Sequence, residues 1–266
     1  MTLRPVHGLA PLFALFAFSL LLPAPGTSQV ILNTERFQID EVDGLHIGVD
    51  ASLSGQRGNT QLFDVSSSGI VGVLTSRHWI RTIFGGRYLS QEDRDPILDR
   101  QFVQLRYSFI LSPELRTFHF VQTQSNETLL LRSRWLVGTG VRYSLIETER
   151  TRFALGTGVM GEWERLEPAK VGPDDPTSLD AVRLANLGVL IRDFGSGARL
   201  VNILYVQPDI GDFGNVRVLL DAGLRVPVTE RVRTTLSLEW RHDTRPVSTL
   251  ERDDLIFGMG LGISFR

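Results

Sequence analysis

The chain has 266 residues, with 28 lysines and arginines against 30 aspartates and glutamates, and no cysteine. This nearly neutral balance, without a run of basic residues, gives no reason to expect nucleic acid as a partner. The lack of cysteine excludes disulfides and a lipid anchor on an N-terminal cysteine. A mean hydropathy of +0.01 argues against a helical protein that crosses a membrane several times.

The first residues of the chain have the pattern of a secretory signal peptide. Arg4 precedes an apolar run at residues 9–22, and small residues follow that run. Gly26 and Ser28 suit the −3 and −1 positions of a cleavage site, so we expect cleavage before Gln29 and export of the chain. An uncleaved anchor is the alternative. The predicted organisation is a signal peptide at residues 1–28, a short periplasmic lead-in at 29–43 and one β-barrel domain at 44–266.

From residue 44 onward, large apolar side chains alternate with small or polar ones. In the C-terminal stretch Leu255, Phe257 and Met259 alternate with Gly258 and Gly260. A period of two predicts a strand, because successive side chains of a strand point to opposite faces. The predicted strands cover residues 45–54, 62–73, 79–90, 103–111, 115–124, 135–145, 153–163, 182–192, 201–205, 216–224, 232–240 and 255–266. The strand at 182–192 has the least regular pattern, because both of its faces carry aliphatic residues.

The lengths of the strands and of their connections favour a barrel that spans a membrane. About ten residues is the length that a tilted strand needs to cross a bilayer. Short turns are predicted near residues 76, 112–114, 147–150, 194–197 and 227–230, and longer outer loops include residues 91–99, 165–179 and 244–252. The prediction is a closed antiparallel transmembrane β-barrel of about twelve strands, as in bacterial outer membranes. A secreted or periplasmic β-sandwich would show the same alternation and is the alternative fold.

Two sets of residues follow from the predicted barrel. All four tryptophans lie near strand ends, where an aromatic girdle belongs: Trp79, Trp135, Trp163 and Trp240. Charged residues fall on the face opposite the apolar stripe. The candidates for lining the lumen are Arg81, Arg87, Arg106, Arg142, Glu162, Glu164, Arg217, Asp221, Arg225, Arg233, Glu239 and Arg241, together with Asp50 and Asp64. Glycines such as Gly138 and Gly140 share that face and leave room for bulky side chains.

Four short segments resemble one family of bacterial proteins. They are GVDASLS at residues 48–54 followed by RGNT at 57–60, LVGTGV at 136–141, YVQP at 205–208, and RHDTRP at 241–246 with two aspartates at 253–254. These segments are similar to the salt-induced outer membrane proteins, a poorly characterised set of β-barrels. The resemblance covers most of residues 30–266. It implies an outer-membrane location and no established activity.

The charges predicted for the lumen leave two functions open. They can form a constriction that selects small solutes, or a structural ion-pair network that closes the interior. The predicted function is a narrow channel for small solutes or ions, linked to envelope or osmotic stress. The alternative is a non-conducting barrel with a structural or surface-interaction role. We predict no enzyme, since the nearest approach to a hydrolase triad, His242 and Asp243 with Ser237, puts the serine out of hydrogen-bond reach.

The expected surroundings of the protein follow from the outer-membrane prediction. The partners are outer-membrane lipid, lipopolysaccharide and, during biogenesis, the barrel-assembly machinery. We expect no cofactor and no metal site, because no ligand spacing appears in the sequence. Acidic pairs in the loops, such as Asp174 and Asp175, are expected to be solvated. The sequence leaves the oligomeric state open.

Overall fold

The computed structural model describes residues 43–58, 61–91, 96–229 and 232–263. The predicted signal peptide at residues 1–28 and all but the last residue of the predicted lead-in lie outside the described residues. In the part that is described, the chain is built from strands and one short 3-10 helix, η2, at Glu127–Leu129. Within these ranges no helix is both long and apolar enough to cross a membrane.

Within the described residues, thirteen strands form a single antiparallel sheet. Their positions agree closely with the strands expected from the period-two alternation. The strands are β1 (Gly44–Gln56), β2 (Leu62–Thr75), β3 (His78–Gln91), β4 (Leu98–Ile110), β5 (Leu115–Asn126), β6 (Leu131–Glu147), β7 (Thr151–Leu166), β8 (Ser178–Leu184), β9 (Asn186–Asp193), β10 (Arg199–Pro208), β11 (Val216–Pro227), β12 (Val232–Asp243) and β13 (Asp253–Ile263).

The strand predicted at residues 182–192 is broken into two short strands. Val159 of β7 lies opposite Leu184 of β8, and Gly156 of β7 lies opposite Leu187 of β9. The alignment against β7 is therefore the same on both sides of the break at Ala185. Because β8 and β9 share one place beside β7, the sheet has twelve positions in its order, and the break accounts for the one strand beyond the predicted twelve.

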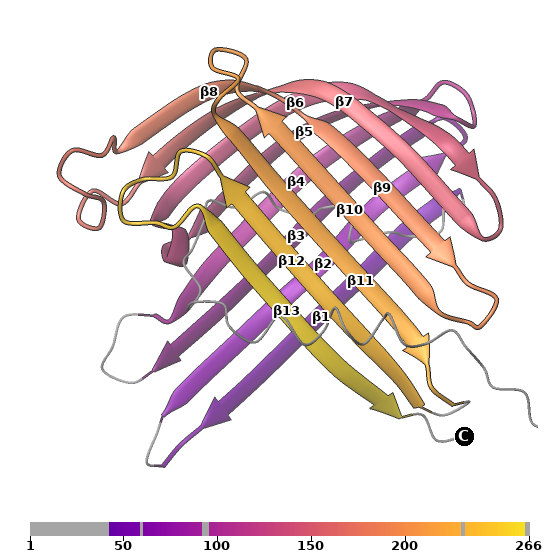
Figure 1. Ribbon diagram of the computed structural model, residues 1–266, viewed down its shortest axis with the longest axis horizontal. Coiled ribbons are helices and arrows are strands. Elements are labelled where there is room, and N and C mark those ends of the chain that lie inside the picture. The colour runs from indigo at the N-terminus through magenta and orange to yellow at the C-terminus, as the bar shows by residue number, and fades with distance from the viewer. Residues whose placement is uncertain (1–42, 59–60, 92–95, 230–231, 264–266) are drawn as a thin grey trace, which may run out of the picture.

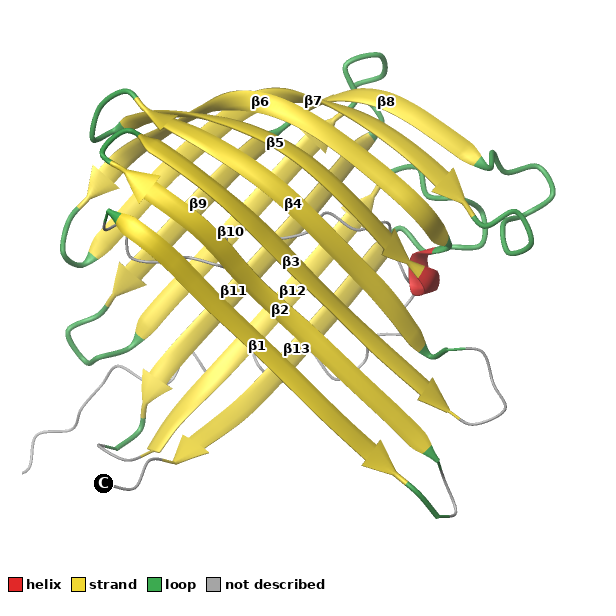
Figure 2. Ribbon diagram, turned by 180° about the vertical axis from the view of Figure 1, so that it is seen from behind, coloured by secondary structure: helices red, strands yellow, loops and turns green. Residues whose placement is uncertain are grey.

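Except for β8 and β9, which both pair with β7, each strand pairs with its neighbours in the chain, and the sheet curls strongly. In Figures 1 and 2 the strands β10–β13 lie on one side of the molecule and β1–β4 on the other, at a steep angle to each other. The ends of the sheet are β1 and β13, and no hydrogen-bonded pairing joins these two strands in the described ranges. We call the face inside the curl the inner face and the opposite face the outer face.

The connections between strands differ at the two ends of the sheet. One end has short turns, such as residues 76–77 and 148–150, and the other has the long connections 167–177 and 244–252. We call these the turn end and the loop end. This alternation of short and long connections was predicted from the sequence.

The outer face carries large apolar side chains, which are exposed on most strands and half-buried on β9 and β11. Leu53 on β1 is 72% exposed and Phe257 on β13 is 80% exposed, and exposed apolar side chains occur on most of the strands between them. The buried arginines, glutamates and glutamines lie on the inner face. A water-soluble protein has the opposite arrangement, with its apolar side chains inside.

The two longest connections are joined at the loop end. Ser248 donates hydrogen bonds from its backbone nitrogen and its hydroxyl to the carboxylate of Asp175, the latter at 2.7 Å. The neighbouring residue Val247 packs in a buried apolar cluster with Leu129, Leu131 and Leu166. The connection between β12 and β13 is therefore held against the connection between β7 and β8.

Candidate functional site

A network of buried charges fills the inner face near the loop end. Glu162 and Glu164 lie two residues apart on β7, so both side chains point to the inner face. Arg134 on β6 lies directly opposite Glu164, and Arg217 on β11 lies directly opposite Asp243 on β12. We call the set formed by Arg134, Glu162, Glu164, Arg183, Arg217 and Asp243 the charge network.

Direct hydrogen bonds connect every member of the charge network. Arg183 Nε donates to Glu162 Oε2 at 2.6 Å, and Arg134 Nε lies 3.1 Å from Glu162 Oε1. Arg217 donates to Glu162 at 2.5 Å, to Glu164 at 2.7 and 3.2 Å, and to Asp243 at 2.9 Å. Arg134 also pairs with Glu164. Arg217 thus reaches from β11 to β7, although β8, β9 and β10 lie between them in the sheet.

The charge network is balanced and almost completely removed from solvent. Three arginines face three carboxylates, and Glu164 and Asp243 are both 0% exposed. Buried ions lose their hydration, and only close pairing and hydrogen bonding offset that cost. Each member therefore depends on the others, and the network holds the two sides of the curled sheet together.

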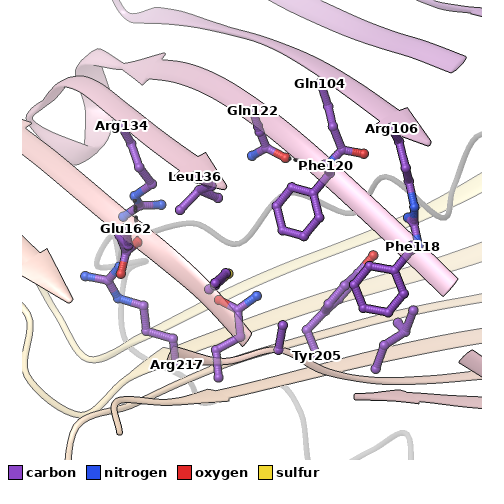
Figure 3. Close-up of a pocket in the computed structure, with 14 residues that line it drawn as sticks. Gln104, Arg106, Phe118, Phe120, Gln122, Arg134, Leu136, Glu162, Tyr205 and Arg217 are labelled. Atoms are coloured by element: carbon purple, nitrogen blue, oxygen red, sulfur yellow. Dashed lines mark hydrogen bonds and ion pairs between the residues drawn. The ribbon is translucent and has the colours of Figure 1, made fainter. Parts of the chain in front are cut away.

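A small cavity lined by both polar and apolar side chains lies beside the charge network (Figure 3). Its volume is about 60 Å³, enough for roughly four water-sized molecules at 10–15 Å³ each. Glu162 and Arg217 lie at one end of this cavity, and Arg106 and Phe118 at the other. Two amides in its wall are linked, since Gln104 donates to Gln122 at 2.7 Å, and Gln122 in turn donates to Gln124 at 2.7 Å.

The structure brings only some of the predicted lumen residues together. Glu162, Glu164 and Arg217 meet in the charge network. Arg241 forms a second group, in which it pairs with Glu239 and with Asp254 at 3.3 Å. The other predicted residues are distributed as follows: Arg87 pairs with Asp64 at 2.8 Å, Arg81 and Arg106 lie against aromatic rings, Arg142 and Asp221 are half-buried, and Asp50, Arg225 and Arg233 are exposed.

Sequence reasoning missed three members of the charge network. Arg134 lies an even number of residues before Gly138, so the alternation already assigned it to the inner face. The sequence does not assign Arg183 to either face, because its strand has aliphatic residues on both faces. Asp243 was considered only as a partner of His242 in a hydrolase. The alternation could have found Arg134, but no local signal marks Arg183 as a partner of Glu162.

The prediction of an aromatic girdle was wrong for Trp79. This side chain is only 4% exposed, and the guanidinium carbon of Arg81 lies 4.0 Å from its ring centroid. Trp79 and Arg81 are two residues apart on β3 and therefore share the inner face. Trp135 and Trp163 are exposed on the outer face and lie opposite each other on β6 and β7. Trp240 donates to Asp253 at 3.0 Å on the outer face of β12.

The nearest candidate for a hydrolase triad is not assembled. Ser237 and His242 are five residues apart on β12, so their side chains point to opposite faces of the sheet. His242 Nδ1 lies 2.8 Å from Asp253, whereas the hydroxyl of Ser237 donates to the carbonyl of Gly258 at 3.4 Å. Across the described ranges, no cluster of three histidines or acids has the geometry to hold a metal ion.

A family model described as a protein of unknown function, DUF481, matches residues 49–265. The chain belongs to the DUF481 family. The DUF481 match covers β2–β13 and most of β1, so it includes the charge network and the cavity. It agrees with the expectation of an uncharacterised family, but it does not carry the name of the salt-induced outer membrane proteins. No curated protein matches this DUF481 chain.

Proposed function

We propose that this protein is an outer-membrane β-barrel that forms a narrow channel for small solutes or ions. One observation carries this proposal: the outer face is apolar over the middle of the sheet, with its apolar side chains exposed on most strands, and the buried charges are on the inner face. Lipid stabilises an apolar outer surface, whereas a charge on such a surface costs about 2–4 kcal/mol at the middle of the bilayer. In water the same surface would cause aggregation.

The proposed barrel is closed by pairing of β1 with β13. Lipid offers no hydrogen bonds to backbone groups, so a sheet in a bilayer cannot keep two free edges. Because β8 and β9 share one place, closure gives a ring of twelve positions, and an even number makes β1 and β13 antiparallel, as in single-chain bacterial barrels. Both edge strands expose apolar side chains on the outer face, including Ile47 and Met259.

The passage runs along the wall formed by β1, β12 and β13. Inner positions on β12 and β13 carry Thr235, Ser237, Gly258 and Gly260, which are small and exposed. Inner positions on β7 are filled by Glu162 and Glu164, which are buried. A twelve-stranded barrel lies between barrels filled by their own side chains and barrels with a wide channel. A lumen that is half filled by the charge network leaves a narrow channel.

A non-conducting barrel is the second candidate function, and the charge network is the observation that favours it. If the network and the joined loops close the lumen completely, the outer surface and loops carry the function. The resemblance to salt-induced outer membrane proteins supports a role in osmotic stress for both the channel and the non-conducting barrel. Measuring the transcript level of this protein after a rise in salt would test that role.

Conductance of the purified protein distinguishes the two candidates. The chain without residues 1–28 is refolded in detergent, and a heat-dependent shift in gel migration identifies the folded barrel. We expect steady single-channel steps in a planar bilayer that scale with salt concentration. A folded sample that inserts but gives no steps would refute the channel and favour the non-conducting barrel. A sample that neither inserts nor shifts in migration would refute the membrane barrel itself.

A further inference from the structure

The connection between β12 and β13, residues 244–252, crosses the inner face of the sheet at the loop end. It leaves β12 after Asp243 and returns at the start of β13. Val247, near its middle, is 4% exposed and packs with Leu129 of η2 and Leu166 of β7. Because β7 lies four places from β12 in the sheet order, this connection reaches from one side of the curl to the other. We call residues 244–252 the strap, which lies at the same end of the sheet as η2 (Figures 1 and 2).

The strap lies over the charge network. Leu166 follows Glu164 by two residues on β7, so both side chains point to the inner face and Leu166 is the nearer to the loop end. Asp243, a member of the network, accepts a hydrogen bond from the backbone nitrogen of Arg245 in the strap at 2.9 Å. Its own backbone nitrogen donates to the carbonyl of Arg252 at 2.9 Å, which joins the two roots of the strap. The network is therefore the floor on which the strap is rooted.

The seat that receives Val247 is built from firmly bonded backbone. The nitrogen of Glu167 donates to the carbonyl of Leu130 at 2.9 Å, which ties the end of β7 to the residue after η2. The nitrogen of Leu166 donates to the carbonyl of Thr177 at 2.9 Å, which closes the base of the connection between β7 and β8. The seat is thus fixed to the wall formed by β6 and β7.

Side chains near the surface hold the middle of the strap. The hydroxyl of Ser248 donates to Asp175 at 2.7 Å, and Arg245 pairs with Asp212 at 2.5 Å while these two side chains are 60% and 41% exposed. Exposed polar pairs of this kind contribute little to stability. Val247 is the buried apolar side chain of the strap. A segment with few buried contacts and exposed hydrogen bonds opens more readily than the strands beside it.

We infer that the strap is a lid of the lumen. In this structure it closes the loop-end mouth, and it opens when Val247 leaves its seat while both roots stay on β12 and β13. The proposed passage runs along the wall to which these roots belong, so a solute that reaches the loop end meets the strap. The effect on conduction rests on the channel proposed above, whereas the movement of the strap does not.

A reducible crosslink tests the lid, because the chain has no cysteine of its own. The variant Asp175→Cys/Ser248→Cys puts two thiols at a contact between the strap and the opposite connection. A short bis-methanethiosulfonate reagent then locks the strap, and a reducing agent releases it. The two single cysteine variants, treated with the same reagent, control for modification alone. Val247→Ser loosens the seat, and Thr249→Ala is its control because Thr249 is an exposed residue of the strap.

Single-channel recording measures the ratio of open to closed time. We expect the crosslinked variant to stay closed and to regain its openings after reduction. Val247→Ser should raise the ratio by about tenfold or more, as expected when a buried valine side chain loses its apolar surroundings. Thr249→Ala and the single cysteine variants should behave as the wild type. Gel migration after heating confirms that each variant is folded.

The movement of the strap is also measured without any current. Spin labels on Asp174→Cys/Thr249→Cys lie beside the contact and leave it intact, since both positions are exposed. We expect dipolar broadening between the two labels, and adding Val247→Ser should weaken it as the strap moves away.

The outcomes separate the lid from the channel. A protein that conducts equally when crosslinked, when reduced and with Val247→Ser would overturn the lid and leave the channel intact. Labels that separate with Val247→Ser in a folded protein that never conducts would support the moving strap and refute the channel. Labels that stay together with Val247→Ser in a folded protein would overturn the inference.

Discussion

Neutralising Glu164 tests the idea that the charge network holds the curled sheet together. The carboxylate is 0% exposed and accepts hydrogen bonds from Arg134 and Arg217. Glu164→Gln keeps the shape of the side chain but leaves Arg134, Arg183 and Arg217 facing only two carboxylates. Removing one partner of a buried ion pair costs about 3–5 kcal/mol, because an uncompensated charge remains in the interior. We therefore expect a loss of this size in the free energy of unfolding.

The assay is urea unfolding of the refolded protein in detergent, followed by tryptophan fluorescence and by heat-dependent gel migration. Asp180→Asn is the matched control, since Asp180 pairs with Arg165 at 2.7 Å while both side chains are about half exposed. Exposed pairs contribute about 0–1 kcal/mol. Glu164→Gln combined with Arg134→Met restores the charge balance and should recover much of the loss. The reasoning is refuted if Glu164→Gln costs no more than Asp180→Asn.

Three further predictions concern the outer face, the inner glycines and the loops. Met259→Arg puts a charge on the outer face of β13 and should weaken insertion into lipid vesicles by about 2–4 kcal/mol, whereas insertion equal to wild type would argue against a lipid-facing surface. Gly140→Ala should lower stability in urea unfolding by about 1–3 kcal/mol, because an added Cβ would collide with the backbone oxygen of Thr157 and would lie 2.5 Å from the ring of Phe118. Gly223→Ala, with nothing within 4 Å of the added atom, serves as its control and should be neutral. Hydrogen bonds from Ser248 lower the pKa of Asp175. The contact between the two loops is therefore complete above the ordinary aspartate pKa of about 3.9, and it is lost as the pH falls through the lowered pKa of Asp175. We expect faster proteolysis of residues 167–177 at that low pH. Loop cleavage that does not change with pH would contradict this prediction.

Alternation along single strands was enough to predict most of the fold. Phe257 and Met259 against Gly258 and Gly260 define a strand without any knowledge of its neighbours, and the same holds for most of the other predicted segments. The break at Ala185 was not predictable, because it changes neither the alignment with β7 nor the local composition. Trp79 was mispredicted for a different reason. It lies near a strand end, which is typical of an aromatic girdle, but it is two residues from Arg81 and therefore points to the same inner face.

The candidate site was only partly predictable, for a reason that lies in the curl of the sheet. Parity identifies which charges point inward, and it identified Glu162, Glu164 and Arg217. It cannot identify partners that are separated by other strands, such as Arg217 and Glu162, which are 55 residues apart in the chain. That pairing depends on how tightly the sheet curls, and no local property of β7 or β11 encodes the curl.

The span of the charge network has a consequence for the order in which the protein assembles. Glu162 and Glu164 enter the sheet with β7, but Arg217 arrives with β11 and Asp243 with β12. Until then the two glutamates have only Arg134 and Arg183 as cationic partners within the network. A chain stopped before β11 would therefore carry an unfinished polar interior, whereas a complete chain gains the last ion pairs together with its final strands. The interior is therefore complete only once β11 and β12 have been added, and unfinished chains differ from finished ones in stability as well as in length.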